Sequence, residues 1–190
     1  MRPPRERKRP EILQSLENGL PDARLKMGPS VFGIWATGRG VRNISFPAIE
    51  TVLTGRRKVT VSVNINRDLG HEESRWVSET AALLETVLHG RPPEVCPRID
   101  LGGTTMFTRR VLEIAMEIPW GETKSYRWIA RKMGKPNAAR AIGQALGRNP
   151  VPMIISCHRV IKEDGSLGGF GLGTEWKRWL LELEREGKGL

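Results

Sequence analysis

The hydrophobic pattern of the first half of the chain is that of a small β-sheet with one helix. Apolar and polar residues alternate from Lys58 to Asn66, which is the period of a half-buried strand. Two short apolar runs between Ser30 and Phe46 flank Thr37-Gly38-Arg39-Gly40, a composition typical of a hairpin turn. Residues 74–89 switch to helical spacing, and Gly90 stops the helix.

Beyond residue 104 the pattern becomes largely helical. An apolar stripe from Phe107 to Ile118 follows Thr104 and Thr105, either of which can cap a helix. A short helix capped by Ser125 and a second one from Asn137 to about Leu146 are separated only by a Gly-containing turn. In a basic chain, two such helices suggest a helix-turn-helix.

The last predicted helix begins near Thr174, which can cap it. Its apolar stripe places Glu184 at the edge of the buried face, at about 100° per residue. This carboxylate can therefore face inward toward a histidine, or it can be exposed.

These patterns together predict an α/β (α+β) fold with two domains. We expect residues 1–27 to form a basic flexible arm and lead-in, because charge and proline dominate its start. Residues 28–90 are expected to form the sheet and helix domain. A linker rich in proline and glycine is expected at 91–104, and a helical C-terminal domain at 105–190.

The composition indicates a polyanionic partner. Lys and Arg number 31 against 21 Asp and Glu, a formal charge of +10, which favours nucleic acid, although a generally basic surface is the alternative. Two cysteines cannot form a disulfide framework, and no zinc spacing occurs, so we expect no metal. We also expect an intracellular, cytoplasmic monomer without membrane contact, because no long apolar or signal-type segment is present.

The second helix of the helix-turn-helix is rich in small residues. A helix that reads the major groove carries long polar side chains, whereas Ala139, Ala141 and Gly143 let a backbone approach a shallow surface such as a minor groove. Tight helix packing would require the same residues. Arg140, alone among small neighbours, can enter a base stack or contact a phosphate, or be an ordinary exposed arginine.

The candidate chemistry lies at residues 149–160, where an apolar run of strand type ends in Cys157, His158 and Arg159. A thiol is nucleophilic as thiolate, and cationic or imidazole neighbours favour that form. Neighbouring residues of a strand point to opposite faces, so contact between Cys157 and His158 requires a kink or a bridging water. A buried structural cysteine is the alternative interpretation.

A glycine-rich loop, residues 165–173, follows the cysteine segment. It has no Walker lysine and no strand-to-helix context, so we expect no nucleotide cofactor.

In this order, these segments resemble the O6-alkylguanine-DNA alkyltransferases. The resemblance covers about residues 28–186. It is densest in Ile118-Pro-Trp-Gly-Glu-Thr-Lys-Ser-Tyr126, in Gly147-Arg-Asn-Pro-Val-Pro152 and in Ser156-Cys-His-Arg-Val-Ile161. It implies a winged-helix-like C-terminal domain that carries the active-site cysteine.

The resemblance also implies the role of each site residue. Cys157 would accept the alkyl group, activated through a water by His158, which Glu184 would orient. Asn149 would hold the active-site turn, and Tyr126 would help to rotate the damaged nucleotide and protonate or polarise the leaving guanine. The other expected contacts are with DNA, at Arg140, Ala139, Ala141, Gly143, Ser125 and Arg127, and with the base in its pocket, at Val160, Phe170, Gly171 and Trp179.

The implied activity is repair of O6-alkylguanine in double-stranded DNA, bound through the minor groove. The base would be flipped, its alkyl group moved irreversibly to the cysteine, and each protein spent after one transfer, with no cofactor. The chain departs from the family pattern at Ser156, where proline is usual, and in Phe170-Gly171-Leu172-Gly173, where a serine and a second glycine are usual.

Three other functions remain open. An alkyltransferase-like protein would bind and flag the lesion without repairing it, although such relatives lack the reactive cysteine. A cysteine hydrolase is less favoured, because adjacent Cys and His are poorly placed for direct pairing. A plain helix-turn-helix regulator would leave the Cys-His-Arg segment unexplained.

Overall fold

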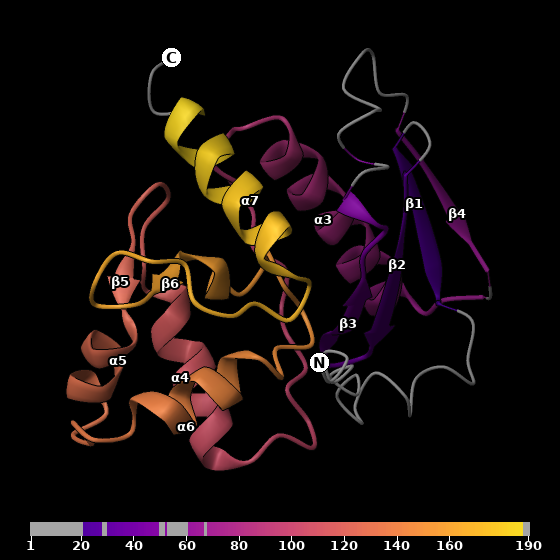
Figure 1. Ribbon diagram of the computed structural model, residues 1–190. Helices are drawn as coiled ribbons and strands as arrows, with labels where there is room; N and C mark the ends of the chain where they lie inside the picture. The colour runs from indigo at the N-terminus through magenta and orange to yellow at the C-terminus, as the bar shows by residue number, and fades with distance from the viewer. Residues whose placement is uncertain (1–20, 28–29, 50–51, 53–60, 67, 188–190) are drawn as a thin grey trace, which may run out of the picture.

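The computed structural model describes residues 21–27, 30–49, 52, 61–66 and 68–187. The expected arm at residues 1–11 and the first residues of the alternating segment, 58–60, lie outside these ranges. The described part of the chain forms a four-stranded antiparallel sheet and, to the left of it in Figure 1, a cluster of helices. The sheet order is β3-β2-β1-β4, with bounds β1 (Ala23–Met27), β2 (Ser30–Thr37), β3 (Gly40–Ser45) and β4 (Val61–Ile65).

The hairpin and the alternating strand are both present. β2 and β3 pair around the turn, with Thr37 opposite Gly40, so the hairpin prediction is confirmed. The alternating segment forms β4, but Val63 and Ile65 are 41% and 55% exposed. They lie opposite the buried Leu25 and Ala23 of β1, yet β4 is an edge strand and α3 packs on β2 and β3. β4 therefore forms where a strand was expected, but its described residues are exposed and not half-buried.

The helix of the first half, α3 (His71–Leu88), begins three residues before the predicted one. Its buried face carries Trp76, Val77, Leu83, Leu84 and Val87. Gly90 follows it with φ +74°, a backbone conformation that glycine adopts without strain.

The second half consists of short helices in the predicted order: α4 (Met106–Met116), α5 (Tyr126–Lys132), α6 (Ala139–Leu146) and α7 (Thr174–Gly187). Thr105 caps α4 by accepting from Thr108 N, and Ser125 caps α5 by accepting from Trp128 N. α4, α5 and α6 pack on one another. The strands β5 (Lys124–Ser125) and β6 (Val160–Ile161) pair in parallel beside them.

The strand expected before the cysteine does not form. Residues 151–156 make a buried turn with one isolated bridge, Pro152 to Ile155, and residues Cys157–Arg159 form a 3-10 turn, η1. Met153 has φ +71°, a conformation that non-glycine residues rarely adopt. The alternation of faces inferred for Cys157 and His158 therefore does not apply, and the position of each follows from this turn.

Several contacts join the two halves of the structure. The stretch 91–104 contains no helix, but Arg98 O and Asp100 N are both hydrogen-bonded to the backbone of Val41, at 2.7 and 2.8 Å. α7 lies beside α3 in Figure 1, and Trp176 Nε1 of α7 donates to Pro47 O at 3.3 Å. Ile44 N of β3 donates to Pro150 O at 3.0 Å, next to the cysteine turn. The sheet is therefore attached directly to the segment that carries Cys157.

No helix in the described ranges is long and apolar enough to cross a membrane.

Candidate active site

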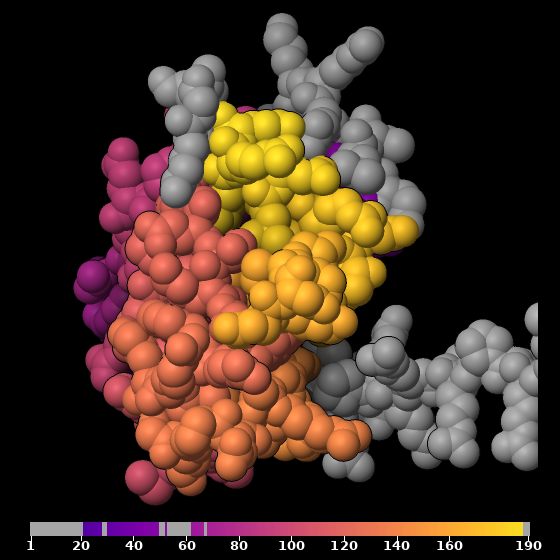
Figure 2. Space-filling view, turned by 60° about the vertical axis from the view of Figure 1, so that its left-hand side comes forward, coloured from indigo at the N-terminus to yellow at the C-terminus, as the bar shows by residue number. Residues whose placement is uncertain are grey.

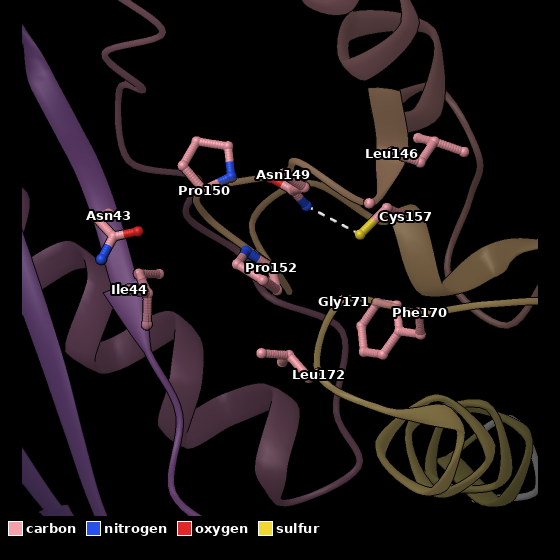
Figure 3. Close-up of a pocket in the computed structure, with 11 residues that line it drawn as sticks. Asn43, Ile44, Leu146, Asn149, Pro150, Pro152, Cys157, Phe170, Gly171 and Leu172 are labelled. Carbon is pink, nitrogen blue, oxygen red and sulfur yellow. Dashed lines mark hydrogen bonds between the residues drawn. The ribbon is translucent and has the colours of Figure 1, made fainter. Parts of the chain in front are cut away.

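Cys157 is held by Asn149 at one end of a pocket. The thiol is 4% exposed, and Asn149 Nδ2 donates to its Sγ at 2.9 Å (Figure 3). The same amide nitrogen lies 3.3 Å from Ile155 O, and Asn149 Oδ1 accepts from Val151 N at 3.0 Å. A single side chain therefore closes the turn and donates a hydrogen bond to the sulfur.

The environment of Cys157 keeps the resting thiol protonated. Burial raises its pKa to about 11, although the hydrogen bond from Asn149 and the nearby charge of Lys177 act in the opposite direction. The thiolate is then only ~10⁻⁴ of the population at pH 7. A nucleophile of this kind requires a base that removes the proton during reaction.

His158 is positioned to be that base. Its ring is 1% exposed, and Nε2 lies 2.7 Å from Glu184 Oε1. Burial lowers the pKa of His158, so the ring is neutral at pH 7. Because a carboxylate only accepts, we assign the single proton to Nε2, which leaves the lone pair on Nδ1. Nδ1 is buried and has no hydrogen-bond partner among the described residues.

Glu184 is the centre of a buried charge network. Its carboxylate, 0% exposed, accepts from His158, from Gly121 N at 2.9 Å, and from Arg159 Nε and Nη2 at 2.9 Å each. Burial alone would raise the pKa of Glu184, but the bonds from His158 and Arg159 outweigh it and lower the pKa to about 2. Arg159 also donates to Ile118 O at 2.7 Å and lies over the Trp120 ring. Of the two orientations that the sequence left open for Glu184, the structure shows the inward one.

Lys177 is a buried cation that the sequence prediction missed. It is 1% exposed, and its Nζ donates to Val160 O at 2.6 Å and to Gly169 O at 3.3 Å. Burial lowers the pKa of Lys177 to about 8. The ammonium thus ties the glycine-rich loop to β6 and brings a positive charge close to Cys157. Its position seven residues before Glu184, on the same face of α7, is the sequence signal for it.

Tyr126 stands at the start of α5 against two glycines. A Cβ on Gly168, which has φ +69°, would lie 2.8 Å from Tyr126 Oη, and one on Gly143 would lie 3.6 Å from the ring. Oη donates to Gly169 O at 3.4 Å. Burial raises the pKa of Tyr126, so the phenol is protonated at neutral pH and can donate. Gly143 of α6 therefore faces Tyr126 at the start of α5.

The pocket beside Cys157 has walls from both halves of the chain, as Figure 3 shows. It encloses about 410 Å³ of empty space, including its open mouth. Phe170 and Gly171 line it as expected. Val160 and Trp179 do not; both are buried, Trp179 with its ring 5.5 Å from that of Trp176. The full lining is Asn43, Ile44, Leu146, Gly147, Asn149, Pro150, Pro152, Cys157, Phe170, Gly171 and Leu172.

The helix-turn-helix residues lie on the outer surface of the second half. In Figure 2, α5, α6 and the golden loop after β6 occupy one face of the molecule. Arg127, Arg140 and Ala141 are exposed there, and Ala139 is half-buried. Ser125 caps α5 with its hydroxyl oxygen, so only its O–H is free to donate outward.

Ser156, where the resembling family usually has proline, already has a backbone suited to proline. Its φ is −75°, within proline's range, and its N–H donates to no backbone carbonyl in the described part of the chain. We expect Ser156→Pro to raise the free energy of unfolding by about 0.4–1 kcal/mol, because the unfolded chain loses freedom. Urea denaturation would measure this, and a loss of stability would contradict it.

Comparison with known proteins identifies the family. Residues 106–186 match the family model described as "6-O-methylguanine DNA methyltransferase, DNA binding domain". The methylated-DNA–protein-cysteine methyltransferase of Mycobacterium leprae is 40% identical over 152 residues, covering 76% of this chain and 91% of that protein. The protein of the same name from Methanosarcina barkeri is 35% identical, covering 77% and 85%.

A solved structure agrees with the sequence comparison. The crystal structure of Mycobacterium tuberculosis OGT in complex with DNA has a TM-score of 0.63 and 31% identity to this chain, and covers 86% of this chain and 93% of that one. With relatives this similar over nearly their whole length, the chain belongs to the methylated-DNA–protein-cysteine methyltransferase family.

Proposed function

We propose that this protein repairs DNA by moving the alkyl group of an O6-alkylguanine from duplex DNA to Cys157, once per molecule. The observation that carries the proposal is a buried thiol next to a pocket and to a neutral, buried histidine whose Nδ1 is free. Family membership supports the same reaction, because the relatives are methyltransferases that act on methylated DNA.

The proposed DNA-binding surface is the face that carries α5 and α6. Arg127 and the hydroxyl of Ser125 would contact phosphates, and Arg140 would fill the gap left by the flipped nucleotide. Ala139, Ala141 and Gly143 would lie against the minor groove, where small side chains permit close approach. The damaged base must leave the stack to reach a buried sulfur, which costs a few kcal/mol. Tyr126 does not line the pocket, but from the start of α5 it would turn the nucleotide outward.

The first chemical step is removal of the thiol proton. The His158 ring makes no hydrogen bond with Cys157 in the described structure, so a bridging water would carry the proton from Sγ to Nδ1. The Glu184 carboxylate stabilises the imidazolium that forms, through the bond at Nε2. Asn149 donates to the developing thiolate, and the charge of Lys177 favours it.

The second step is displacement at the alkyl carbon. A bond forms between Sγ and that carbon while the carbon–O6 bond breaks, and its electron pair goes to guanine. The proton lost by the thiol is returned to guanine, with Tyr126 Oη–H polarising the ring. The thioether has no easy route back to thiol, so each chain acts once and needs no cofactor. Such a substrate would place the protein with the DNA, in the cytoplasm or in a eukaryotic nucleus.

Mass spectrometry with peptide mapping tests the proposal. The protein is incubated with a duplex that carries one O6-methylguanine, and with the unmodified duplex. One methyl group should appear at Cys157 only with the damaged duplex. The exposed Cys96 is an internal control, because unspecific alkylation would modify it before a buried thiol. Tight lesion binding without a change in mass would instead mean that the protein flags the damage.

Lys177→Met should slow the transfer about 10-fold, a prediction that follows from the buried ammonium. Removing its charge raises the pKa of Cys157 further, and the loop loses its bond at Gly169 O. The neighbouring Arg178 is exposed, so Arg178→Met is the matched control and should keep the wild-type rate. Single-turnover rates measure the effect, and equal slowing in both variants would contradict the role of Lys177.

A further inference from the structure

The pocket reaches beyond the sulfur to the sheet of the first half. One end is formed by Cys157, Leu146 and Phe170, and the other by Asn43 and Ile44 of β3. In Figure 3 these two ends face each other across Pro152 and Leu172. Apart from Asn43 at the far end and Asn149 beside the sulfur, the lining side chains between the ends are apolar. A methyl group on guanine would occupy only the part next to the sulfur.

Asn43 brings an unpaired acceptor to the far end. The residue is 2% exposed, and its Oδ1 is buried without a hydrogen-bond partner among the described residues. Buried polar side chains are nearly always hydrogen-bonded, because an unpaired one loses its hydration without replacement. Asn43 lines the pocket, so its unpaired Oδ1 can accept a hydrogen bond from a ligand group that enters there.

Asn43 follows an irregularity in the pairing of β2 with β3. The register of β2 and β3 shifts between Trp35 and Ala36, so that Asn43 pairs with Trp35 and Ile44 with Ile34. The extra residue of this bulge is Arg42, and the two residues that follow it, Asn43 and Ile44, are both buried. The bond from Ile44 N to Pro150 O fixes this strand against the cysteine turn. The far wall is therefore held in place relative to the sulfur.

We propose that this extension of the pocket accepts O6-alkyl groups of several carbons that end in a hydrogen-bond donor, with Asn43 as the residue that recognises the end. The inference rests on the proposed alkyl transfer. In the reaction Sγ bonds to the first carbon, the carbon–O6 bond breaks, guanine leaves with the proton, and the tail extends toward Asn43. A water at Asn43 would be displaced by either tail, but only a terminal hydroxyl restores the lost hydrogen bond.

Two isosteric tails test this recognition. Duplexes carry O6-(4-hydroxybutyl)guanine, O6-pentylguanine or O6-methylguanine, and single-turnover transfer to Cys157 is followed by mass. We expect the wild type to transfer 4-hydroxybutyl about 10-fold faster than pentyl, the scale of one hydrogen bond to a buried unpaired group. In Asn43→Leu and Asn43→Ala this ratio should fall to about 1. A ratio taken within each protein cancels any loss of active molecules.

Asn64→Leu is the matched control, since Asn64 is exposed on β4 and does not line the pocket. It should keep the wild-type ratio. Equal rates for the two tails in the wild type, or a ratio that survives both Asn43 substitutions, would overturn the role of Asn43. Absence of methyl transfer from O6-methylguanine by the wild type would instead refute the proposed function itself, so the two failures are distinguishable.

Discussion

Replacing Cys157 with alanine is expected to reduce alkyl transfer by about 10⁴-fold or more while duplex binding persists. The variant removes the acceptor atom itself, and the other described cysteine, Cys96, lies on the surface away from the pocket lining. Asn149 loses the sulfur but keeps its contacts with Ile155 O and Val151 N, so the turn should remain closed. The exposed basic residues of α5 and α6 are unchanged.

Two measurements separate chemistry from binding in this variant. Intact mass follows the transfer, and fluorescence anisotropy follows affinity for damaged and undamaged duplexes at the same salt concentration, because phosphate contacts depend on salt. Cys96→Ala is the control and should transfer as the wild type does. Alkylation that continues in Cys157→Ala, or that stops in Cys96→Ala, would mean that the wrong cysteine has been assigned.

Local sequence signals predicted the elements that local chemistry determines. Ser125 caps its helix as expected, and Thr105 is the one of two candidate threonines that caps α4. The turn at Thr37 to Gly40 forms the hairpin. Helical spacing placed Glu184 at the edge of the buried face and left its orientation open, and the structure buries it. The two helix caps each join residues within one helical turn, and the hairpin joins residues on either side of one turn. The position of Glu184 depends on the face of a single helix.

The cysteine turn was not predictable in this way. A short apolar, β-branched run fits a strand and a buried turn equally well, because both place the same side chains in the core. Here Asn149 closes the turn from within, and Met153 adopts φ +71°. Such strain persists only where the surrounding structure enforces it. The contact of β3 with Pro150 is one of the tertiary bonds that do so.

Buried charge was missed for a related reason. Lysine and arginine are expected on surfaces, so Lys177 received no role and Arg159 was considered only as a neighbour of the thiol. In the structure, backbone carbonyls from β6 and the glycine-rich loop satisfy Lys177, and Glu184 satisfies Arg159. These partners lie 8 to 25 residues away along the chain. Pairing at such separations depends on the folded arrangement, which composition and periodicity do not contain.

Glu184→Gln is expected to cost about 3–5 kcal/mol of folding free energy, because it leaves the buried Arg159 guanidinium without its counter-charge. It should also slow the transfer about 100-fold, since His158 loses the carboxylate that stabilises its protonated form. Glu182 is exposed on the same helix, so Glu182→Gln is the matched control and should change stability by less than about 0.5 kcal/mol. Urea denaturation at pH 7 measures the difference. Similar stabilities for the two variants would refute a structural role for the buried network.

The same residue sets how stability depends on pH. The folded-state pKa of Glu184, about 2, lies below its ordinary value of 4.5, so the folded carboxylate releases its proton more readily than the unfolded one. Its stabilisation is therefore complete above pH 4.5 and is lost as pH falls toward 2. His158, whose pKa is lowered by burial, adds a loss in the same direction below about pH 6.5. Between pH 5 and pH 3 we expect the wild type to lose about 2 kcal/mol more than Glu184→Gln does, measured by urea denaturation at each pH. Parallel stability curves for the two proteins would show that folding does not lower the pKa of this carboxyl.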